Sequence, residues 1–176
     1  MKKIGIISDT HGGLCPDVFK HFEGVDAILH AGDIGTEEVL IELEAIAPVY
    51  AVRGNVDFFQ AAHHLPRKRV EVFDGVRFGL IHGDIFPKST ILDQLIPYFA
   101  KDHVDAIVFG HTHERYLRKR GSVWLINPGA SNPRQASSCH SVAVVQVDSG
   151  HILSVTDMAL QPFQTDDLFP DWEDEI

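Results

Sequence analysis

The stretch IGIISDTH, residues 4–11, decides the fold, because a short β-type run is followed at once by Ser, Asp, Thr and His. Outward from it, the pattern predicts a helix at 17–22, a strand at 26–30, an amphipathic helix at 36–46 with Thr36 as N-cap, and a strand at 49–52. This alternation of strands and helices at short spacing predicts parallel strands joined by helical crossovers.

The rest of the chain predicts mainly strands. Two β-type runs, 67–73 and 76–81, flank Asp74-Gly75, a strong signal for a two-residue hairpin turn. Beyond them the pattern predicts a helix at 89–100 that Pro97 disturbs in its last turn, and strands at 105–109, 114–118, 123–126, 140–147 and 152–156. Parallel units followed by antiparallel strands predict two packed sheets with helices on their outer faces, an α/β (α+β) class of fold. We expect one domain at 1–160 and an acidic C-terminal tail at 161–176.

Composition limits the classes of partner. The chain has 176 residues, 44% of them hydrophobic and 23% charged, as in an ordinary soluble domain. Its net charge of −10 argues against duplex nucleic acid and anionic membranes as partners, although a local cationic site can still bind a small anion. No apolar run approaches a membrane span or a signal peptide, and the two cysteines fit a reducing compartment, so we expect a cytoplasmic protein. A homo-oligomer is left open.

Five apolar runs each end in potential metal ligands, with glycine beside most of them: Asp9 and His11, Asp33, Asn55, His82, and His111 and His113. Ligands collect at the carboxyl ends of strands in α/β sheets, so we expect these side chains to converge. Any single histidine of this kind is more often a hydrogen-bonded residue at a strand end. Five apolar runs that all end in Asp, Asn or His favour a metal site instead.

The number of ligands indicates two ions. Seven side chains are too many for one tetrahedral ion, and Asp33 is suited to bridge two ions with its two oxygens. The pairs Asp9/His11 and His111/His113 are two residues apart, so in extended backbone each pair points one way and can bind one ion. Oxygen and imidazole ligands without sulfur fit manganese, iron, zinc, cobalt or nickel better than calcium or copper(I). Among these we expect manganese first.

With these residues in place, the chain resembles the calcineurin-like metallophosphoesterase superfamily, and within it the small prokaryotic single-domain phosphodiesterases. The motifs read, in order, D-T-H at 9–11, G-D at 32–33, G-N-V-D at 54–57, His82, and G-H-T-H at 110–113. The resemblance covers the chain from residue 4 to about 155.

The resemblance implies a four-layer αββα sandwich, two mixed β-sheets flanked by helices. It further implies one ion held by Asp9, His11, Asp33 and His113, and a second held by Asp33, Asn55, His82 and His111. A hydroxide bridging the two ions would then attack a small phosphodiester substrate, so that Asp33, Asn55 and His82 serve catalysis through the metals, with Asp57 as a further candidate.

One position departs from the family motif. The residue after Asn55 is Val56, where the full motif has a histidine that assists the leaving group. Acid catalysis is worth ~10²–10⁴-fold, so we expect activity on aryl diesters and weaker activity on alkyl monoesters. The alternatives are a phosphomonoesterase, a nuclease, or a non-catalytic interaction scaffold such as the small subunit of the retromer coat.

Several further residues have weaker indications. His30 is either a residue that holds a ligand or an ordinary residue at a strand end, and Asp57 could orient the Asn55 loop or a ligand histidine. Asn127, Ser131 and Arg134 lie in a loop that could reach the substrate. The tail is either folded onto the domain or frayed, or it is a docking or oligomer segment.

Overall fold

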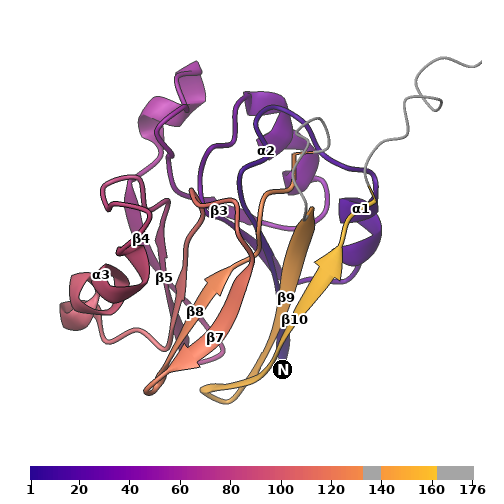
Figure 1. The fold of residues 1–176 in the computed structure, drawn as a ribbon. Coiled ribbons are helices and arrows are strands. Elements are labelled where there is room, and N and C mark those ends of the chain that lie inside the picture. Colours follow the sequence, from indigo (N-terminus) through magenta and orange to yellow (C-terminus); the bar gives the residue numbers. More distant parts are fainter. Residues whose placement is uncertain (133–139, 162–176) are drawn as a thin grey trace, which may run out of the picture.

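Ten strands form two sheets in the computed structural model, which describes residues 1–132 and 140–161 (Figure 1). The first sheet has the order β10-β9-β1-β2-β3, and the second has the order β4-β5-β6-β8-β7. The strands are β1 Lys2–Ile7, β2 Ala27–His30, β3 Val49–Ala51, β4 Lys68–Phe73, β5 Val76–Ile81, β6 Ala106–Val108, β7 Tyr116–Arg120, β8 Val123–Asn127, β9 Ser141–Asp148 and β10 His151–Ala159.

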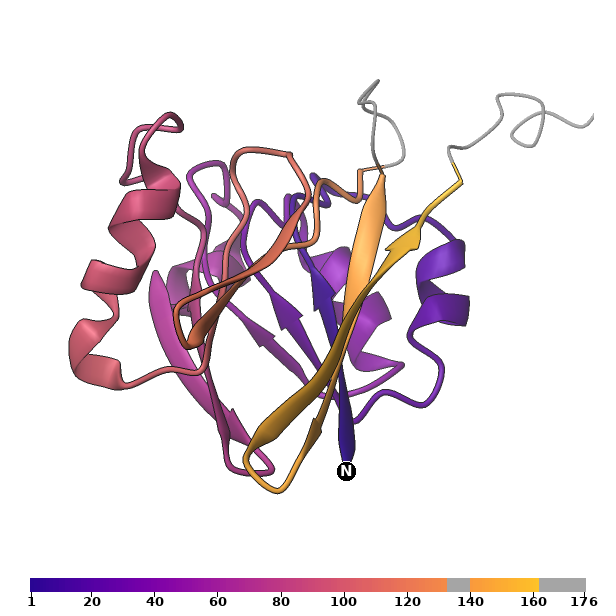
Figure 2. The ribbon, with the colours of Figure 1, turned by 60° about the horizontal axis from the view of Figure 1, so that its bottom comes forward.

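Three α-helices flank the sheets: α1 Asp17–His21, α2 Glu37–Glu44 and α3 Ile91–Tyr98. Short 3-10 helices lie at η1 Gln60–His64 and η2 Ala100–Asp102. Helices α1 and α2 cover the outer face of the first sheet, and α3 covers the outer face of the second (Figures 1 and 2). This is the expected αββα order of layers. No helix in the described ranges is long and apolar enough to cross a lipid bilayer.

Both sheets are mixed. Strand β1 pairs in parallel with β2 and β2 with β3, which confirms the predicted βαβαβ unit. In the second sheet β5, β6 and β8 are parallel, and β4 and β7 are antiparallel at the two edges. The late strands β9 and β10 return to the first sheet, where β9 lies antiparallel to β1.

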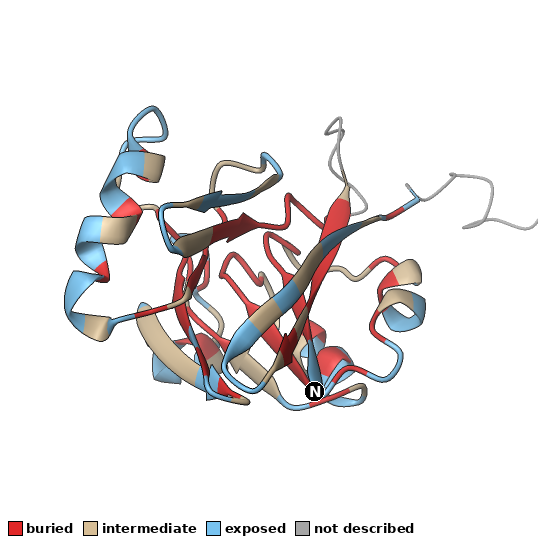
Figure 3. Cartoon of the chain, turned by 90° about the horizontal axis from the view of Figure 1, so that it is seen from below, coloured by how far each residue is buried: buried red, intermediate tan, exposed pale blue. Residues whose placement is uncertain are grey.

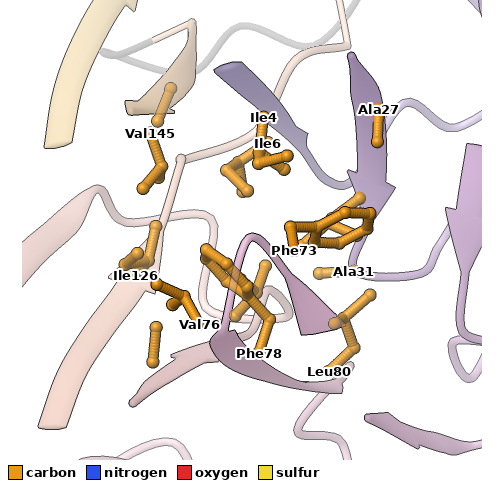
Figure 4. Close-up of a cluster of buried hydrophobic side chains, with 14 of the residues drawn as sticks. Ile4, Ile6, Ala27, Ala31, Phe73, Val76, Phe78, Leu80, Ile126 and Val145 are labelled. Atoms are coloured by element: carbon orange, nitrogen blue, oxygen red, sulfur yellow. The ribbon is translucent and has the colours of Figure 1, made fainter. Parts of the chain in front are cut away.

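Three apolar layers hold the four structural layers together. The middle layer fills the space between the sheets and contains Ile4, Leu29, Phe78 and Val108. Figure 4 shows part of this layer, with Ile4 of the first sheet opposite Phe78 of the second. The strands alternate sides, so the neighbouring residues Ile28 and Ile107 face the helices. Figure 3 shows the same division, since the central strands are buried and the helices expose their outer sides.

Most predicted elements lie within two residues of the observed ones. The predicted strand at 114–118 is shifted to Tyr116–Arg120, because Glu114 still belongs to the preceding loop, where its N–H donates to Oγ1 of Thr112 at 3.2 Å. The helix expected at 89–100 ends at Tyr98, directly after Pro97. The hairpin turn at Asp74-Gly75 is confirmed, with φ of 49° and 84°. Residues 162–176 of the predicted tail lie outside the described residues.

Candidate metal centre

The loops after β1, β2, β3, β5 and β6 carry all seven predicted ligands. Figure 2 shows β1 running away from the N-terminus, so these loops lie at the far end of the sandwich from Met1. We call this the ligand end of the molecule. Both sheets contribute to it, since β1, β2 and β3 belong to one sheet and β5 and β6 to the other.

Four of the predicted ligands converge. One side-chain donor atom from each lies within 4.8 Å of all the others in the group formed by Asp9, His11, Asp33 and His113. Nε2 of His113 is 3.2 Å from Oδ1 of Asp9. Nε2 of His11 is 3.8 Å from the same oxygen and 3.9 Å from Oδ2 of Asp33. Two carboxylates and two imidazoles at these distances match one oxygen- and nitrogen-ligated cation.

A second group adjoins the first through Asp33. Oδ2 of Asp33, which faces His11, is also 3.1 Å from Nε2 of His82. The His82 ring in turn lies against the His111 ring, with centroids 5.2 Å apart. Asn55 is exposed on the neighbouring loop. The structure therefore brings six of the seven residues into two adjoining groups that meet at Asp33.

Three donor atoms in these groups lack a hydrogen-bond partner although they are buried: Oδ1 of Asp9, Nε2 of His11 and Nε2 of His82. A buried polar atom left without a partner costs about 1–3 kcal/mol. A cation bound between them would satisfy these atoms, so the donor set fits a metal.

The ring of His82 has one defined role for each nitrogen. Its Nδ1 lies 2.8 Å from the carbonyl oxygen of Ala31, which can only accept, so Nδ1 carries the proton and donates. The lone pair of Nε2 then points into the site. A backbone carbonyl bound to the outer nitrogen is the usual way in which proteins orient a metal-binding histidine.

Asp9 is held in a similar way. Its Oδ2 accepts hydrogen bonds from Oγ of Ser8 at 2.6 Å and from the N–H of His111 at 3.3 Å. These contacts fix the carboxylate and link the loops after β1 and β6, and they leave Oδ1 facing His113.

Electrostatics favour positive charge at this place. Burial works to raise the pKa of Asp33, but contacts with His82, the Val56 N–H and His11 outweigh it and lower that pKa. Burial works to lower the pKa of His82, but the carboxylates of Asp33 and Asp9 outweigh it and raise that pKa. Contact with Asp9 likewise raises the pKa of His113. A divalent cation would supply the positive charge that these carboxylates stabilise.

The backbone of the ligand loops is strained. Eight non-glycine residues in the described ranges have positive φ, and five of them are predicted ligands: Asp9, His11, Asp33, His111 and His113. Such conformations cost free energy and cluster at functional sites. The expectation of extended backbone is therefore wrong for both pairs, although Asp9 and His11 still lie in one group. The expectation that His111 and His113 bind one ion is not supported. His113 faces Asp9, whereas His111 faces His82.

Glycine is required beside two ligands by close approach. A Cβ on Gly54 would lie 2.1 Å from Oδ1 of Asp33, and a Cβ on Gly110 would lie 2.1 Å from Oγ of Ser8. Both distances are below any real contact, so these positions exclude side chains. The glycines in the G-N and G-H motifs thus make room for the ligands of neighbouring loops.

Asp57 holds the Asn55 loop, one of the two roles considered for it. The buried carboxylate accepts the N–H of Gly54 at 2.8 Å and the N–H of Gly35 at 2.9 Å. It therefore ties the loop after β3 to the loop after β2.

His30 contacts no ligand side chain. Its Nδ1 accepts the N–H of Gly32, and its Nε2 lies 3.0 Å from Oγ1 of Thr10, whose hydroxyl donates to Ile34. The imidazole is fully buried, and burial lowers its pKa to about 4, so it is neutral. It joins the loops after β1 and β2 and so positions Asp9, His11 and Asp33 through the backbone.

Asn127 and Ser131 are buried and hold the ligand loops, in contrast to the expected reach toward substrate. Nδ2 of Asn127 donates to the Gly110 carbonyl at 3.1 Å and to Oγ1 of Thr112 at 3.0 Å. Oγ of Ser131 donates to the Ser8 carbonyl at 2.9 Å. Arg134 lies outside the described residues.

Sequence reasoning missed Ser8 and Thr10 as supporting residues. Both lie inside the D-T-H stretch, but a hydroxyl beside a ligand has no spacing signal of its own. Their partners Asp9 and His30 are identified only when the loops are seen together.

Comparisons with known proteins identify the family of this chain. Residues 1–150 match the family model described as the calcineurin-like phosphoesterase superfamily domain. A probable metallophosphoesterase of Methanothermobacter thermautotrophicus is 37% identical over 155 residues, which cover 82% of this chain and 86% of that protein. A phosphodiesterase of Methanocaldococcus jannaschii is 30% identical over 144 residues, which cover 72% of this chain and 82% of that protein.

Among solved structures, the crystal structure of a Vps29 single mutant from Entamoeba histolytica is similar, with a TM-score of 0.75 and 18% identity. The match covers 90% of this chain and 99% of that chain. At this identity the likeness shows a shared fold.

Proposed function

Because the chain belongs to the calcineurin-like phosphoesterase superfamily, we propose that it is a two-metal phosphodiesterase that hydrolyses small phosphodiesters. The observation that carries the proposal is the set of buried donor atoms without partners, Oδ1 of Asp9, Nε2 of His11 and Nε2 of His82, which meet around Asp33. The identity of the two ions is part of the proposal: Mn²⁺ first, with iron, zinc, nickel or cobalt as alternatives.

The proposed ligand sets follow the two groups. One ion would be held by Asp9, His11, Asp33 and His113, and the other by Asp33, Asn55, His82 and His111. The first set is supported by the convergence of all four side chains. The second is supported by the contacts of His82 with Asp33 and His111. We assign Asn55 to the second set because its loop, which Asp57 holds in place, lies at the same end of the molecule.

When bound, two divalent ions activate a water molecule near neutral pH and offset the charge of a phosphate group. The protein supplies the positions. The Ala31 carbonyl accepts the Nδ1 proton of His82 and so directs Nε2 into the site, and the Ser8 hydroxyl binds Oδ2 of Asp9 and leaves Oδ1 facing inward. In the reaction a water oxygen forms a new bond to phosphorus, the water loses a proton, and the ester bond to the leaving group breaks.

The leaving group receives no proton from residue 56. The Val56 side chain is 39% exposed beside Asp33, whose Oδ1 accepts the Val56 N–H at 3.2 Å. An aliphatic side chain cannot act as an acid, so the leaving group must depart as an anion or take a proton from solvent. We therefore infer a preference for phosphodiesters with good leaving groups, such as aryl esters, over alkyl monoesters.

A second candidate is a non-catalytic scaffold. For either function we propose a location in the cytoplasm. The structural likeness to Vps29 favours it. The complete set of predicted ligands favours the enzyme, since a scaffold has no need of buried donor atoms without partners.

An assay panel tests the proposal. The purified chain is reconstituted with each metal and assayed against aryl diesters, cyclic nucleotides and aryl and alkyl monoesters. Asp33→Ala serves as the inactive reference, and Asp93→Ala serves as the matched control, because Asp93 is a surface acid paired with Arg120. Hydrolysis of the aryl diesters by the control alone is expected. Equal turnover by both variants, or faster turnover of monoesters, would contradict the proposal.

A further inference from the structure

A small pocket lies on the side of the second sheet, beside the loop that carries His111 and His113. Its volume is about 80 Å³. Its apolar walls are Ile91 and Leu92 of α3, Phe109 after β6 and Tyr116 of β7. Sites for drug-sized ligands have volumes of ~300 Å³ or more, so this pocket suits a fragment such as a single ring.

The pocket shares a wall with the loop that carries two predicted ligands. Thr112, which lines it, is the residue between His111 and His113. Nδ2 of Asn127 donates a hydrogen bond to Oγ1 of Thr112 at 3.0 Å, and this bond holds the wall in place. The pocket therefore lies beside the loop that would hold a phosphate at the metal centre.

The residues that line the pocket carry charge of both signs. Lys88 is one of them, and its positive charge works to lower the pKa of both His111 and His113. Arg115 is paired with Asp157, so its charge is already compensated. The carboxylate of Glu114 would repel an anionic group. The contents of the pocket should thus be uncharged, and Lys88 is the lining cation left for an anion nearby.

We propose that this pocket binds the ester group that stays on phosphorus, and that it selects diesters in which this group is a small uncharged ring. Lys88 contacts a phosphate oxygen in the same complex. The inference rests on the proposed phosphodiesterase function and names the substrate class for that site.

The position of Val56 indicates which of the two ester groups would occupy the pocket, namely the group that stays on phosphorus. Val56, beside which the leaving group is expected to depart, belongs to the loop after β3 in the first sheet. The pocket is built from α3, β7 and the end of β6 on the second sheet. The two ester groups of a bound diester would therefore extend toward different sheets.

Two substrates with one leaving group test the proposal. Phenyl 4-nitrophenyl phosphate and methyl 4-nitrophenyl phosphate both release 4-nitrophenolate, and they differ only in the retained group. We expect kcat/KM of the Mn²⁺-loaded chain to be about tenfold or more higher for the phenyl ester, as burial of one ring would give. Binding of phenylphosphonate and methylphosphonate, measured by calorimetry, should show the same preference without turnover.

Variants connect the preference to the pocket. Leu92→Trp fills the pocket and Tyr116→Ala removes a wall, so each should reduce the phenyl-to-methyl ratio to within about twofold of unity for both readouts. Ile96→Trp is the matched control, because Ile96 lies one turn along α3 and does not line the pocket. Lys88→Met should weaken binding of both phosphonates alike, whereas Lys101→Met should not.

The outcomes separate the two proposals. Hydrolysis of both diesters at equal kcat/KM, or a phenyl preference that survives Leu92→Trp and Tyr116→Ala, would overturn the pocket assignment and leave the phosphodiesterase standing. Absence of diester hydrolysis with every metal would overturn the proposed function itself.

Discussion

The two ends of the sandwich use acidic residues in left-handed backbone in opposite ways. At the end that holds the N-terminus and the β4–β5 and β9–β10 turns, which we call the hairpin end, Asp74 accepts the Ser149 N–H at 3.1 Å. The N-terminal ammonium lies 3.3 Å from Asp74 and 2.9 Å from Asp148. At the ligand end, Asp9 and Asp33 face histidines, and three buried donor atoms have no partner.

The difference teaches how to tell a structural carboxylate from a functional one. Both Asp74 and Asp33 have φ near +50°. At the hairpin end the chain itself supplies every cation and N–H that the carboxylate needs. At the ligand end the chain positions the carboxylates and histidines, but a bound cation would have to supply the positive charge.

The largest expected effect is the loss of activity on replacing Asp33 at the ligand end, compared with replacing Asp74 at the hairpin end. Asp33→Ala removes the carboxylate common to both groups and should lower kcat/KM for an aryl diester by at least about 10³-fold, because metal ions contribute several kcal/mol to such reactions. Asp74→Ala should leave kcat/KM within about twofold. Steady-state assays of both variants at saturating Mn²⁺ measure this, and similar losses in the two would abolish the distinction.

The next effect concerns pH and the buried His30. Burial lowers the pKa of His30 to about 4, below the value of ~6.5 in an unfolded chain. The folded state thus favours the neutral ring, and the resulting stability is present above pH 6.5 and is lost as the pH falls toward 4. We expect this loss to be about 3 kcal/mol.

Urea denaturation in EDTA at several pH values measures that loss. His30→Gln keeps a side-chain donor for Thr10 but does not titrate, so its unfolding free energy should fall less over the same range. An equally steep fall in the variant would show that His30 does not contribute.

A smaller effect is expected at Asp57, which supports the ligand end without touching a predicted ligand side chain. Asp57→Asn weakens the bonds to the N–H groups of Gly35 and Gly54, and we expect a loss of about 10–100-fold in metal affinity or kcat/KM. Higher Mn²⁺ should restore part of the rate, as a positioning role requires. Titration of activity with Mn²⁺ gives the readout, and an unchanged titration curve would count against that role.

The smallest effect belongs to the hairpin end. Asp74→Ala removes contacts with Ser149 and the N-terminus and should lower the urea midpoint slightly, with no change on adding Mn²⁺. A midpoint of Asp74→Ala that responds to Mn²⁺ differently from the unsubstituted chain would link the two ends.

Sequence alone predicts much of this molecule because local patterns encode it. The βαβαβ unit follows from the strand and helix periodicity of residues 4–52, and the β4–β5 turn follows from Asp74-Gly75. The convergence of Asp9, His11 and Asp33 could be predicted because the loops after the parallel strands β1 and β2 share one end of a sheet. His113 joins them from the second sheet, so its place depends on how the two sheets pack.

What sequence does not predict depends on contacts between distant segments. No local feature says that β9 returns to pair with β1, or that His111 and His113 separate toward different partners. The supporting roles of His30 and Asn127 likewise depend on Thr10 and Thr112, which only the folded loops bring near. Side-chain roles are therefore predicted less well than side-chain locations.

The most direct test is a crystal structure of the chain grown with Mn²⁺, with anomalous scattering used to locate the metal. We predict two ions per chain at the ligand end, one among Asp9, His11 and His113, one beside His82 and His111, and the Asp33 carboxylate bound to both. A single ion, ions elsewhere, or no ion at saturating Mn²⁺ would contradict the account.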